Sequence, residues 1–429
     1  MSGAATAGPV SSSMMSTLGT RSPSPLRAGT TMMFLGTIVS AVGAYLFQVI
    51  GGRALGAEAF APVSVMWTVF FLGFTVFLLP VEQMVIRRLV LAQGRPRPLA
   101  GATGSIVAVI GGATAIAVGF AVFAKESMLA GEAGFVPVAG VMFICYGVFA
   151  LGRGYLAGSH RYFEYGLVVA LDAIGKVLGA AVVALAGWGP VALSWALILS
   201  PIVVFAVRPF RSAPPTSRVG EQAPDSELRF IAGFLVANAA SQTVLAAGPL
   251  VVGALGASSA AISVFFVTTT LFRGPMSASY NLIARVLPAA TRRAASGDDA
   301  VLDRWAWRIL FGGLVIGVAV GLVGALLGPL VVGVLYGSEF TPDPWLAGFA
   351  AGGVIAGMAG LATTQILVAR GDTGRMAAVW LGALVVAAIT IVVTSADPSL
   401  RVAFAFCMGE SVALIGLSAA ALVPRPQME

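Results

Sequence analysis

The sequence predicts an all-α polytopic membrane protein with twelve transmembrane helices in two pseudo-symmetric six-helix lobes around a central cavity. Three observations favour this fold class: twelve apolar runs, an alternation of positive charge between the connections, and a turn that recurs in each half. A helix needs about 20 residues to cross the hydrocarbon core, where every backbone polar group must be paired within the chain. The apolar runs are 29–52, 61–86, 99–124, 135–157, 164–187, 190–207, 229–253, 261–284, 306–334, 345–369, 376–394 and 402–423.

Positive charge orients these runs in the membrane. If the N-terminus is cytoplasmic, 20 of the 25 Lys and Arg residues lie on the inner side, and only Arg53, Lys125 and Arg401 lie in outer connections. Cytoplasmic loops carry the excess of Lys and Arg, so we predict a multi-pass protein of the cytoplasmic (plasma) membrane with both termini in the cytoplasm. The net charge of +7 is then an orientation signal and indicates no nucleic-acid partner.

Composition leaves no room for a further folded domain. With 58% hydrophobic and 10% charged residues, the spans use nearly the whole chain, and a soluble domain of the usual ~100–150 residues does not fit. The expected segments are a disordered cytoplasmic N-terminus 1–28, an N-lobe 29–207, a Pro- and Ser-rich cytoplasmic linker 208–228, a C-lobe 229–423 and a cytoplasmic tail 424–429.

No motif in the sequence indicates an enzyme. The phosphate loop G-x-x-x-x-G-K-[ST] is absent. Cys145 and Cys407 lie within apolar runs, which predicts small apolar fillers and neither a disulfide nor a metal site. We therefore expect no catalytic residues, no metal and no cofactor. Energy for any transport would come from an ion gradient, the membrane potential or the gradient of the substrate.

The two halves share a short turn. Residues 54–57 and 254–257 both read Ala-Leu-Gly-Ala, and each turn lies between the first two apolar runs of its half. Because each half holds six runs, both halves begin inside, which predicts parallel repeats about an axis along the membrane normal. Such a duplication is typical of transporters with a cavity between two bundles. Helix kinks are expected at Pro80, Pro201, Pro249 and Pro275, and close helix packing at Gly313, Gly317 and Gly321.

Arg273 is the first candidate for contact with a substrate. It lies about midway along the eighth run, with no acidic residue within one helical turn. An ionisable group near the bilayer centre costs ~3 kcal/mol or more unless it is paired or wet. A guanidinium suits phosphate because its planar fork donates two parallel hydrogen bonds. Arg273 could therefore bind an anionic ligand, or it could form a structural pair with another helix.

Other polar residues in the spans have two interpretations each. Asp172 and Lys176 share a helix face at i, i+4; they form an internal pair, or Lys176 faces the cavity as a second cation. Asp172 and Glu410 are candidates for ion coupling, although Glu410 could instead pair with a cation elsewhere. Arg53, at the outer end of the first run, snorkels or guards the mouth of the cavity. Uncharged polar candidates for the cavity are Gln48, Asn238, Gln242 and Asn281.

Three segments resemble the signatures of one family. Residues 52–60, Gly-Arg-Ala-Leu-Gly-Ala-Glu-Ala-Phe, are similar to the A-R-x-L-G-x-x-x-F-G signature of bacterial polysaccharide (O-antigen-type) flippases. These flippases belong to the multidrug/oligosaccharidyl-lipid/polysaccharide (MOP) exporter superfamily. Residues 336–340 resemble their YGxEF/Y loop, and residues 272–275 resemble their FR-x-P region. Ala61-Pro62 departs from the family pattern, which usually has Gly and a plain helix start.

The resemblance implies a function. The family flips lipid-pyrophosphate-linked oligosaccharides from the inner to the outer leaflet by alternating access, for cell-surface polysaccharide synthesis. Its cavity cations contact the pyrophosphate, and that role would fall here to Arg273 and then to Arg53. Lys176 matches no motif, so its candidacy depends on burial alone. The implied partners are the polyprenyl-linked glycan, membrane lipids, and a glycan polymerase or glycosyltransferases, and the closed two-lobe plan predicts a monomer.

Three alternatives remain open at this point. An ion-coupled multidrug/cation antiporter of the same superfamily would share the fold but would favour acidic residues in the cavity. A membrane glycan polymerase or ligase would need a sizeable outer loop, and the longest outer connections have only about ten residues. A non-transporting scaffold for cell-envelope enzymes would keep the fold without needing buried charge.

Overall fold

The protein is helical throughout the part of the chain that the computed structural model describes. These residues are 25–91, 99, 102–211, 225–274, 276, 290, 293 and 299–423. Most of the expected N-terminal segment and linker, and the tail, lie outside them. The elements are α1 (Pro25–Gly73), η1 (Phe74–Leu78), α2 (Leu79–Leu91), α3 (Thr103–Phe123), α4 (Lys125–Met128), α5 (Phe135–Gly158), α6 (Tyr162–Ala186), α7 (Pro190–Leu199), η2 (Ser200–Val207), η3 (Pro209–Arg211), α8 (Asp225–Ala246), α9 (Gly248–Ala254), α10 (Ser259–Phe272), α12 (Asp299–Tyr336), η4 (Ser338–Phe340), α13 (Pro344–Arg370), α14 (Thr373–Val393) and α15 (Pro398–Leu422).

The described helices identify a multi-pass membrane protein. Nine of them are long and apolar enough to cross a membrane, or ten if the bent pair α8 and α9 is counted as one span. The sequence predicted twelve. Two of the predicted runs fall within the single helical stretch Thr31–Leu89, and the predicted run 261–284 is helical in α10 over Ser259–Phe272 before it leaves the described residues. The count of twelve therefore stays a prediction.

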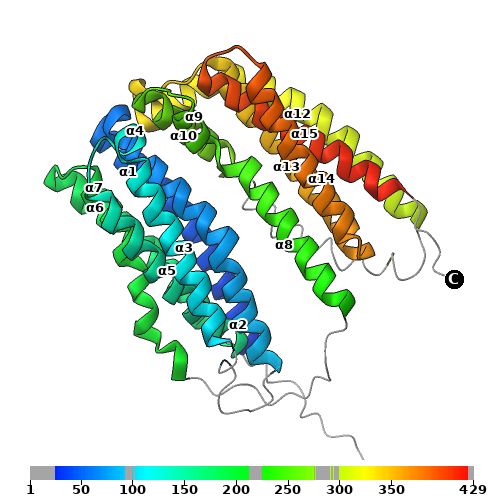
Figure 1. The fold of residues 1–429 in the computed structure, drawn as a ribbon, viewed down its shortest axis with the longest axis horizontal. Coiled ribbons are helices and arrows are strands. Elements are labelled where there is room, and N and C mark those ends of the chain that lie inside the picture. Colours follow the sequence, from blue (N-terminus) through cyan, green and yellow to red (C-terminus); the bar gives the residue numbers. More distant parts are fainter. Residues whose placement is uncertain are drawn as a thin grey trace, which may run out of the picture.

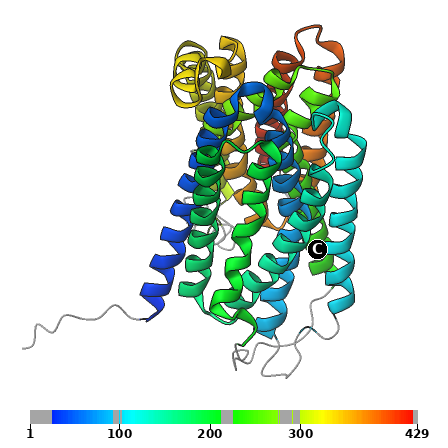
Figure 2. The same cartoon turned by 90° about the vertical axis from the view of Figure 1, so that its left-hand side faces the viewer.

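The long stretch Thr31–Leu89 reverses direction near its middle. Gly56 has φ 77° and ψ 170°, which is not a helical conformation. In Figure 2 the dark blue first part of α1 rises from the lower end, and the lighter blue α2 returns to that end. Each part exceeds the ~20 residues that one crossing requires.

The helices form two groups. Figure 1 shows α1–α7 on one side and α12–α15 on the other, with α8 between them. The groups meet at the end that carries α4, α9 and α10, and they diverge toward the other end. Helix α10 packs on both α1 and α13, whereas α8 packs mainly on α14. We call α1–η3 the N-lobe and α8–α15 the C-lobe.

The glycine of the repeated turn has a positive φ in both lobes. Gly56 has φ 77° and Gly256 has φ 80°. Both values lie in the left-handed region, which glycine adopts without the steric cost that a Cβ imposes. The duplication of the two halves stays a prediction, to which this shared glycine conformation adds support.

Of the four expected kinks, a bend is shown at Pro249, and Pro80 and Pro201 lie at changes of helix type. Pro80 follows the π-helical turn η1, Pro201 lies at the start of the 3-10 segment η2, and Pro249 follows the break between α8 and α9, where the two helix axes differ by 60°. Proline has no N–H to donate, so the helical hydrogen-bond pattern changes where each one lies. Pro275 lies outside the described residues.

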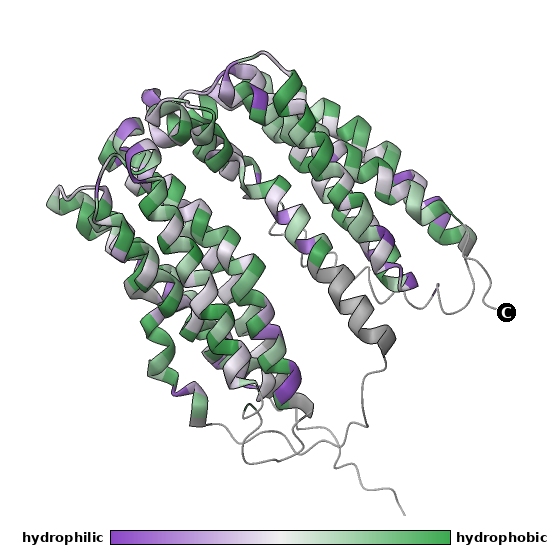
Figure 3. Ribbon diagram, viewed as in Figure 1, coloured by the Kyte–Doolittle hydropathy of each residue, from purple (hydrophilic) through white to green (hydrophobic). Residues whose placement is uncertain are grey.

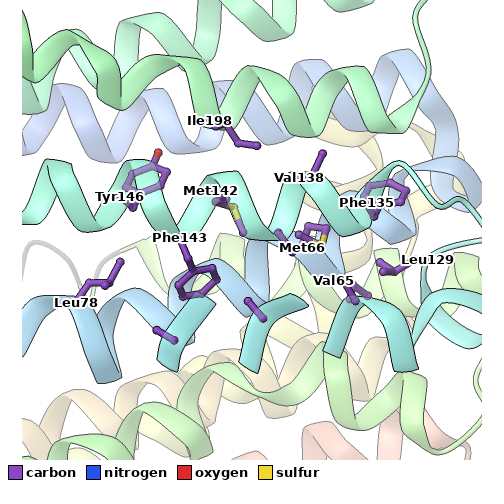
Figure 4. Close-up of a cluster of buried hydrophobic side chains, with 14 of the residues drawn as sticks. Val65, Met66, Leu78, Leu129, Phe135, Val138, Met142, Phe143, Tyr146 and Ile198 are labelled. Atoms are coloured by element: carbon purple, nitrogen blue, oxygen red, sulfur yellow. The ribbon is translucent and has the colours of Figure 1, made fainter. Parts of the chain in front are cut away.

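Apolar packing holds each lobe together. The core cluster that joins α1, α3, α5 and α7 of the N-lobe continues into α9, α10, α13 and α15 of the C-lobe, and Figure 4 shows Met66, Phe135, Met142 and Tyr146 within it. In the C-lobe, the expected glycine ridge is confirmed, because Gly317 and Gly321 on α12 approach the backbone of Gly352 and Gly348 on α13. Figure 3 shows hydrophobic positions along the outer faces of the helices, as a lipid environment requires.

Candidate functional site

A cavity of about 220 Å³ lies between the two lobes. The N-lobe contributes residues from both halves of α1, and the C-lobe contributes residues from α8, α9 and α10. Arg273 is the one lining residue, in the part of the chain described, that carries a formal charge. The lining residues are Ala41, Ala44, Tyr45, Gln48, Trp67, Thr68, Phe71, Gln242, Leu245, Ala246, Pro249, Phe266, Thr269, Thr270, Arg273 and Met276.

Arg273 is placed in the cavity wall by the end of α10. It is the C-cap of that helix, and its N–H donates to the carbonyls of Thr269 and Thr270. Its guanidinium carbon lies 5.0 Å from the centroid of the Phe71 ring, within the range of a cation–π interaction. Phe71 belongs to the N-lobe, so this contact spans the interface between the lobes.

Tyr45 fixes the same region from the opposite side. Its hydroxyl donates to the carbonyl of Thr270 at 2.9 Å, which ties α1 to α10. A Cβ on Gly274 would lie 2.6 Å from the Tyr45 hydroxyl, so glycine is needed there for the close approach.

Two buried amides face the cavity with unused acceptors. Gln48 on α1 is 1% exposed and Gln242 on α8 is 7% exposed. The Oε1 atom of each accepts no hydrogen bond within the described residues. A buried acceptor without a donor costs about 1–3 kcal/mol, so these atoms are suited to receive donors from a ligand or water. Asn238, also expected in the cavity, is half-buried on α8 outside the lining, and Asn281 lies outside the described residues.

The break between α8 and α9 adds backbone acceptors that sequence reasoning missed. Pro249 has no N–H for the carbonyl of Leu245, and the N–H of Leu250 donates to the carbonyl of Ala247 at 3.0 Å. The carbonyls of Leu245 and Ala246 therefore lose their usual helical donors, and both residues line the cavity. Pro249 was the sequence signal, since an irregular backbone within the membrane is tolerated where it lines a cavity.

Glu410 lies deep in the C-lobe beside this site. It is 1% exposed on α15, and a Cβ on Gly357 of α13 would lie 2.8 Å from its Oε2. Within the described residues, Oε2 has no hydrogen-bond partner. Glu410 is not among the described residues that line the cavity.

Asp172 and Lys176 form the internal pair that their spacing allows. The Lys176 ammonium donates to Asp172 Oδ2 at 2.6 Å, and both side chains are buried in the N-lobe. The ammonium also lies 5.1 Å from the centroid of the Tyr146 ring and 5.8 Å from that of Phe70. Neither Asp172 nor Lys176 lines the cavity. Lys176 is therefore not part of the site that we propose below.

A second buried pair lies nearby. Glu82 accepts from Arg153 Nη2 at 3.2 Å and from the Tyr165 hydroxyl at 3.1 Å. The Arg153 guanidinium also donates to the Tyr165 hydroxyl and lies 5.7 Å from the Phe74 ring centroid. Arg153 is 71 residues away in sequence, so no local spacing could identify it.

Arg53 lies away from the cavity, at the end where the lobes meet. It is exposed, and its Nε donates to the carbonyl of Leu335 at 2.7 Å, while its Nη2 donates to the carbonyl of Val334. Both carbonyls belong to the last turn of α12. The segments 52–60 and 336–340, which resemble two flippase signatures, thus lie against each other.

Comparison with known proteins identifies the fold. No family model matches the chain. It is 28% identical over 359 residues to uncharacterized proteins of Mycobacterium bovis and Mycobacterium tuberculosis, covering 78% of this chain and 77% of each relative. Its structure is similar to the inward-facing conformation of a multidrug resistance MATE family transporter of the MOP superfamily, with a TM-score of 0.60, 15% identity, and coverage of 92% of this chain and 97% of that one. The fold is MATE-like.

A second solved structure shares this fold. The outward-facing conformation of a MATE family transporter of the MOP superfamily also matches, with a TM-score of 0.54, 14% identity, and coverage of 92% of this chain and 95% of that one. Within this fold, the predicted site residues separate into three places. Arg273, Gln48 and Gln242 meet at the cavity, Asp172 and Lys176 pair inside the N-lobe, and Arg53 lies where the lobes touch.

Proposed function

We propose that the protein is a transporter that moves a lipid-pyrophosphate-linked oligosaccharide from the inner to the outer leaflet by alternating access. The observation that carries this proposal is the position of Arg273, a cation in the wall of a cavity between the two lobes of a MATE-like fold. A guanidinium at that place suits a phosphate group, because its donors lie in a plane that matches two phosphate oxygens.

The other lining groups complement a sugar diphosphate. The unused Oε1 atoms of Gln48 and Gln242, and the carbonyls freed at the α8–α9 break, can accept hydrogen bonds from sugar hydroxyls. Trp67 and Phe71 supply apolar rings that can pack against a sugar face. The site therefore offers one cation for the phosphate and several acceptors for the sugar that follows it.

Cavity size limits what enters in this conformation. The volume of about 220 Å³ lies below the ~300–1,000 Å³ typical of pockets for drug-sized ligands. A diphosphate with one sugar matches that volume, and a whole oligosaccharide does not. The remaining sugars would lie outside this cavity, and the lipid tail would stay in the membrane.

The conformation supports an inward-facing state. The TM-score is higher against the inward-facing MATE transporter, 0.60, than against the outward-facing one, 0.54. The lobes meet at the end that the charge pattern predicts to be outer. A substrate loaded from the inner leaflet would enter this state.

Lipid-linked intermediates test the proposal directly. In a strain that carries Arg273→Ala as its only copy, we expect polyprenyl-linked glycan to accumulate on the inner leaflet, as in a deletion strain. Mass spectrometry measures the amount of the lipid-linked glycan, and labelling of intact cells shows how much of it is on the outer leaflet. Arg273→Lys should retain part of the transport, because it keeps the charge but loses the planar fork. Arg375→Ala is the matched control, since this half-exposed arginine lies outside the cavity. Normal glycan export with Arg273→Ala would overturn the assignment.

An ion-coupled multidrug antiporter is the second candidate. The structures matched above are those of multidrug resistance transporters, and Glu410 supplies a buried carboxylate beside Arg273. Against this function, a cation in the cavity wall repels cationic drugs. Antiport would appear as sensitivity of the deletion strain to cationic dyes with unchanged lipid-linked glycans, and restored resistance would require Glu410.

A further inference from the structure

The end of α12 receives an arginine from the other lobe. The last four carbonyls of a helix have no donor within the helix, and they form the negative end of its dipole. The N–H of Gly337 donates to the carbonyl of Gly333 at 2.9 Å, and Arg53 donates to the next two carbonyls, those of Val334 and Leu335. Two successive carbonyls are thus occupied by one guanidinium from the N-lobe.

A second hydrogen bond also joins the two lobes, but here the charged side chain comes from the C-lobe. The N–H of Ala57 in the N-lobe donates to Glu339 Oε2 in the C-lobe at 3.3 Å. The left-handed conformation of Gly56 brings this turn against the carboxylate, since a Cβ on Gly56 would lie 3.0 Å from the same Oε2. Each lobe therefore supplies a charged side chain to the backbone of the other.

Apolar rings pack beneath these hydrogen bonds. The Phe60 ring lies 6.2 Å from that of Phe340 and 6.3 Å from that of Phe266, centroid to centroid. A Cβ on Gly52 would lie 3.2 Å from the ring of Tyr336, so glycine permits this contact. Phe60, Tyr336 and Phe340 are fully or nearly fully buried although they come from different lobes.

The equivalent contact in the other half of the repeat is apolar. There Gly253, just before the second turn, packs against Met128 of α4. The Sδ and Cε atoms of Met128 lie 3.1 Å from where a Cβ on Gly253 would be. Glu126 lies in the short helix α4 that follows α3, as Glu339 lies in the short helix η4 that follows α12; it pairs within its own lobe with Lys125 at 3.1 Å and is 80% exposed. Among the described residues, the hydrogen bonds that charged side chains make between the lobes at this end lie at the turn around Gly56 and not at the turn around Gly256.

We infer that the segments 52–60 and 334–340 form an outer latch, which holds the transporter closed on its predicted outer side and must break before substrate leaves. The inference deepens the proposed function and rests on its alternating access. It gives Arg53 a positioning role at the latch in place of contact with phosphate. Exposed hydrogen bonds of this kind are individually weak, which suits a contact that opens in every cycle.

Distance measurements across the latch test the inference without using transport. Spin labels at Glu58→Cys and Thr341→Cys, both exposed and in different lobes, report the separation in the full-length chain in lipid nanodiscs, with Cys145 and Cys407 replaced by alanine. We expect Arg53→Ala and Glu339→Gln each to shift the closed-to-open ratio toward open by roughly 3- to 10-fold. Arg53→Lys should behave like Arg53→Ala, because one ammonium cannot reproduce two fork donors on two carbonyls.

The controls separate a latch from two other roles. Glu126→Gln changes the same residue type in the short helix α4 and should leave the distances unchanged. Unchanged distances in both Arg53→Ala and Glu339→Gln would overturn the latch, and would make these contacts a static tie. Weaker binding of inorganic pyrophosphate by Arg53→Ala, with unchanged distances, would return Arg53 to the phosphate role.

The latch and the proposed function fail in different ways. Arg273→Ala should weaken the binding of inorganic pyrophosphate and leave the labelled distance as it is. If Arg273→Ala has no effect on pyrophosphate, the proposed substrate is wrong, whereas the distance shifts of the Arg53 and Glu339 variants still decide the latch.

Discussion

Three arginines show that the type of a charged residue and its depth in the membrane do not by themselves determine what the residue does. Arg273 lies in the cavity wall against Phe71, Arg53 binds two carbonyls of the other lobe, and Arg153 pairs with Glu82 inside the N-lobe. The sequence identified Arg273 because its run contains no acid nearby. It could not identify the partners of the other two, because each lies on an element distant in sequence. Local spacing predicted only one ion pair correctly, Asp172 with Lys176 at one helical turn.

The Asp172–Lys176 pair gives a prediction at this scale. Removing one member of a buried ion pair leaves an uncompensated charge and costs about 3–5 kcal/mol, whereas replacing both can be neutral. We therefore expect Asp172→Asn to lower the unfolding temperature in detergent strongly, and the double variant Asp172→Asn/Lys176→Met to recover most of the loss.

A surface pair provides the comparison. Asp372 lies 4.0 Å from Arg375 in a partly exposed i, i+3 pair, so Asp372→Asn should change the unfolding temperature little. If the double variant at 172 and 176 is as unstable as the single one, the pair has a role beyond mutual neutralisation.

At the scale of elements, hydropathy located the helices well but missed how they end and join. The runs 376–394 and 402–423 correspond to α14 over Thr373–Val393 and α15 over Pro398–Leu422. Polar residues at an interface continue a helix beyond its apolar run, and hydropathy does not detect this. The turn at Gly56 lies between the predicted runs 29–52 and 61–86, but the connection is shorter than hydropathy indicated, since helix continues on both sides of a single residue.

The break between α8 and α9 carries the prediction at this scale. Pro249→Ala restores an N–H donor to the carbonyl of Leu245 and removes the steric cause of the bend. We expect export of lipid-linked glycan to fall by about tenfold or more, as expected when a site is misaligned by about 1 Å, while the unfolding temperature stays the same or rises.

Another proline serves as the control. Pro329 lies inside α12, outside the cavity lining, so Pro329→Ala should leave export intact. Equal losses in the two variants would indicate that proline acts through folding in both places and that the freed carbonyls have no part in the site.

At the scale of the whole molecule, the sequence predicted an all-α polytopic membrane protein, and the MATE-like, all-helical fold agrees with it. Twelve apolar runs and the duplicated turn suffice for that, because the bilayer allows few alternatives to bundled helices. The cavity lining was predicted in part, through Gln48, Gln242 and Arg273. Tyr45, Trp67 and Phe71 were not assigned to it, since aromatic residues on a membrane helix occur in packing and lipid-facing positions as often as in cavities.

Membrane orientation is a prediction that belongs to the whole molecule. Ser338 and Gly374 are both exposed, near opposite ends of the C-lobe helices. In spheroplasts, with Cys145 and Cys407 replaced by alanine, we expect Ser338→Cys to react with a membrane-impermeant maleimide. Gly374→Cys should react only after the membrane is permeabilised. The reverse pattern would invert the topology that the charge distribution predicts, and the outer latch would then lie on the cytoplasmic side.

The contact between α12 and α13 has a mechanical consequence. Gly317 meets the backbone of Gly352, and Gly321 meets that of Gly348, so main chains touch there without side chains between them. Such an interface can deform little, because a protein interior adapts largely through side chains that change rotamer. We therefore expect α12 and α13 to move as one rigid unit during transport. The conformational change of each cycle would then occur mainly in the short helices α9 and α10.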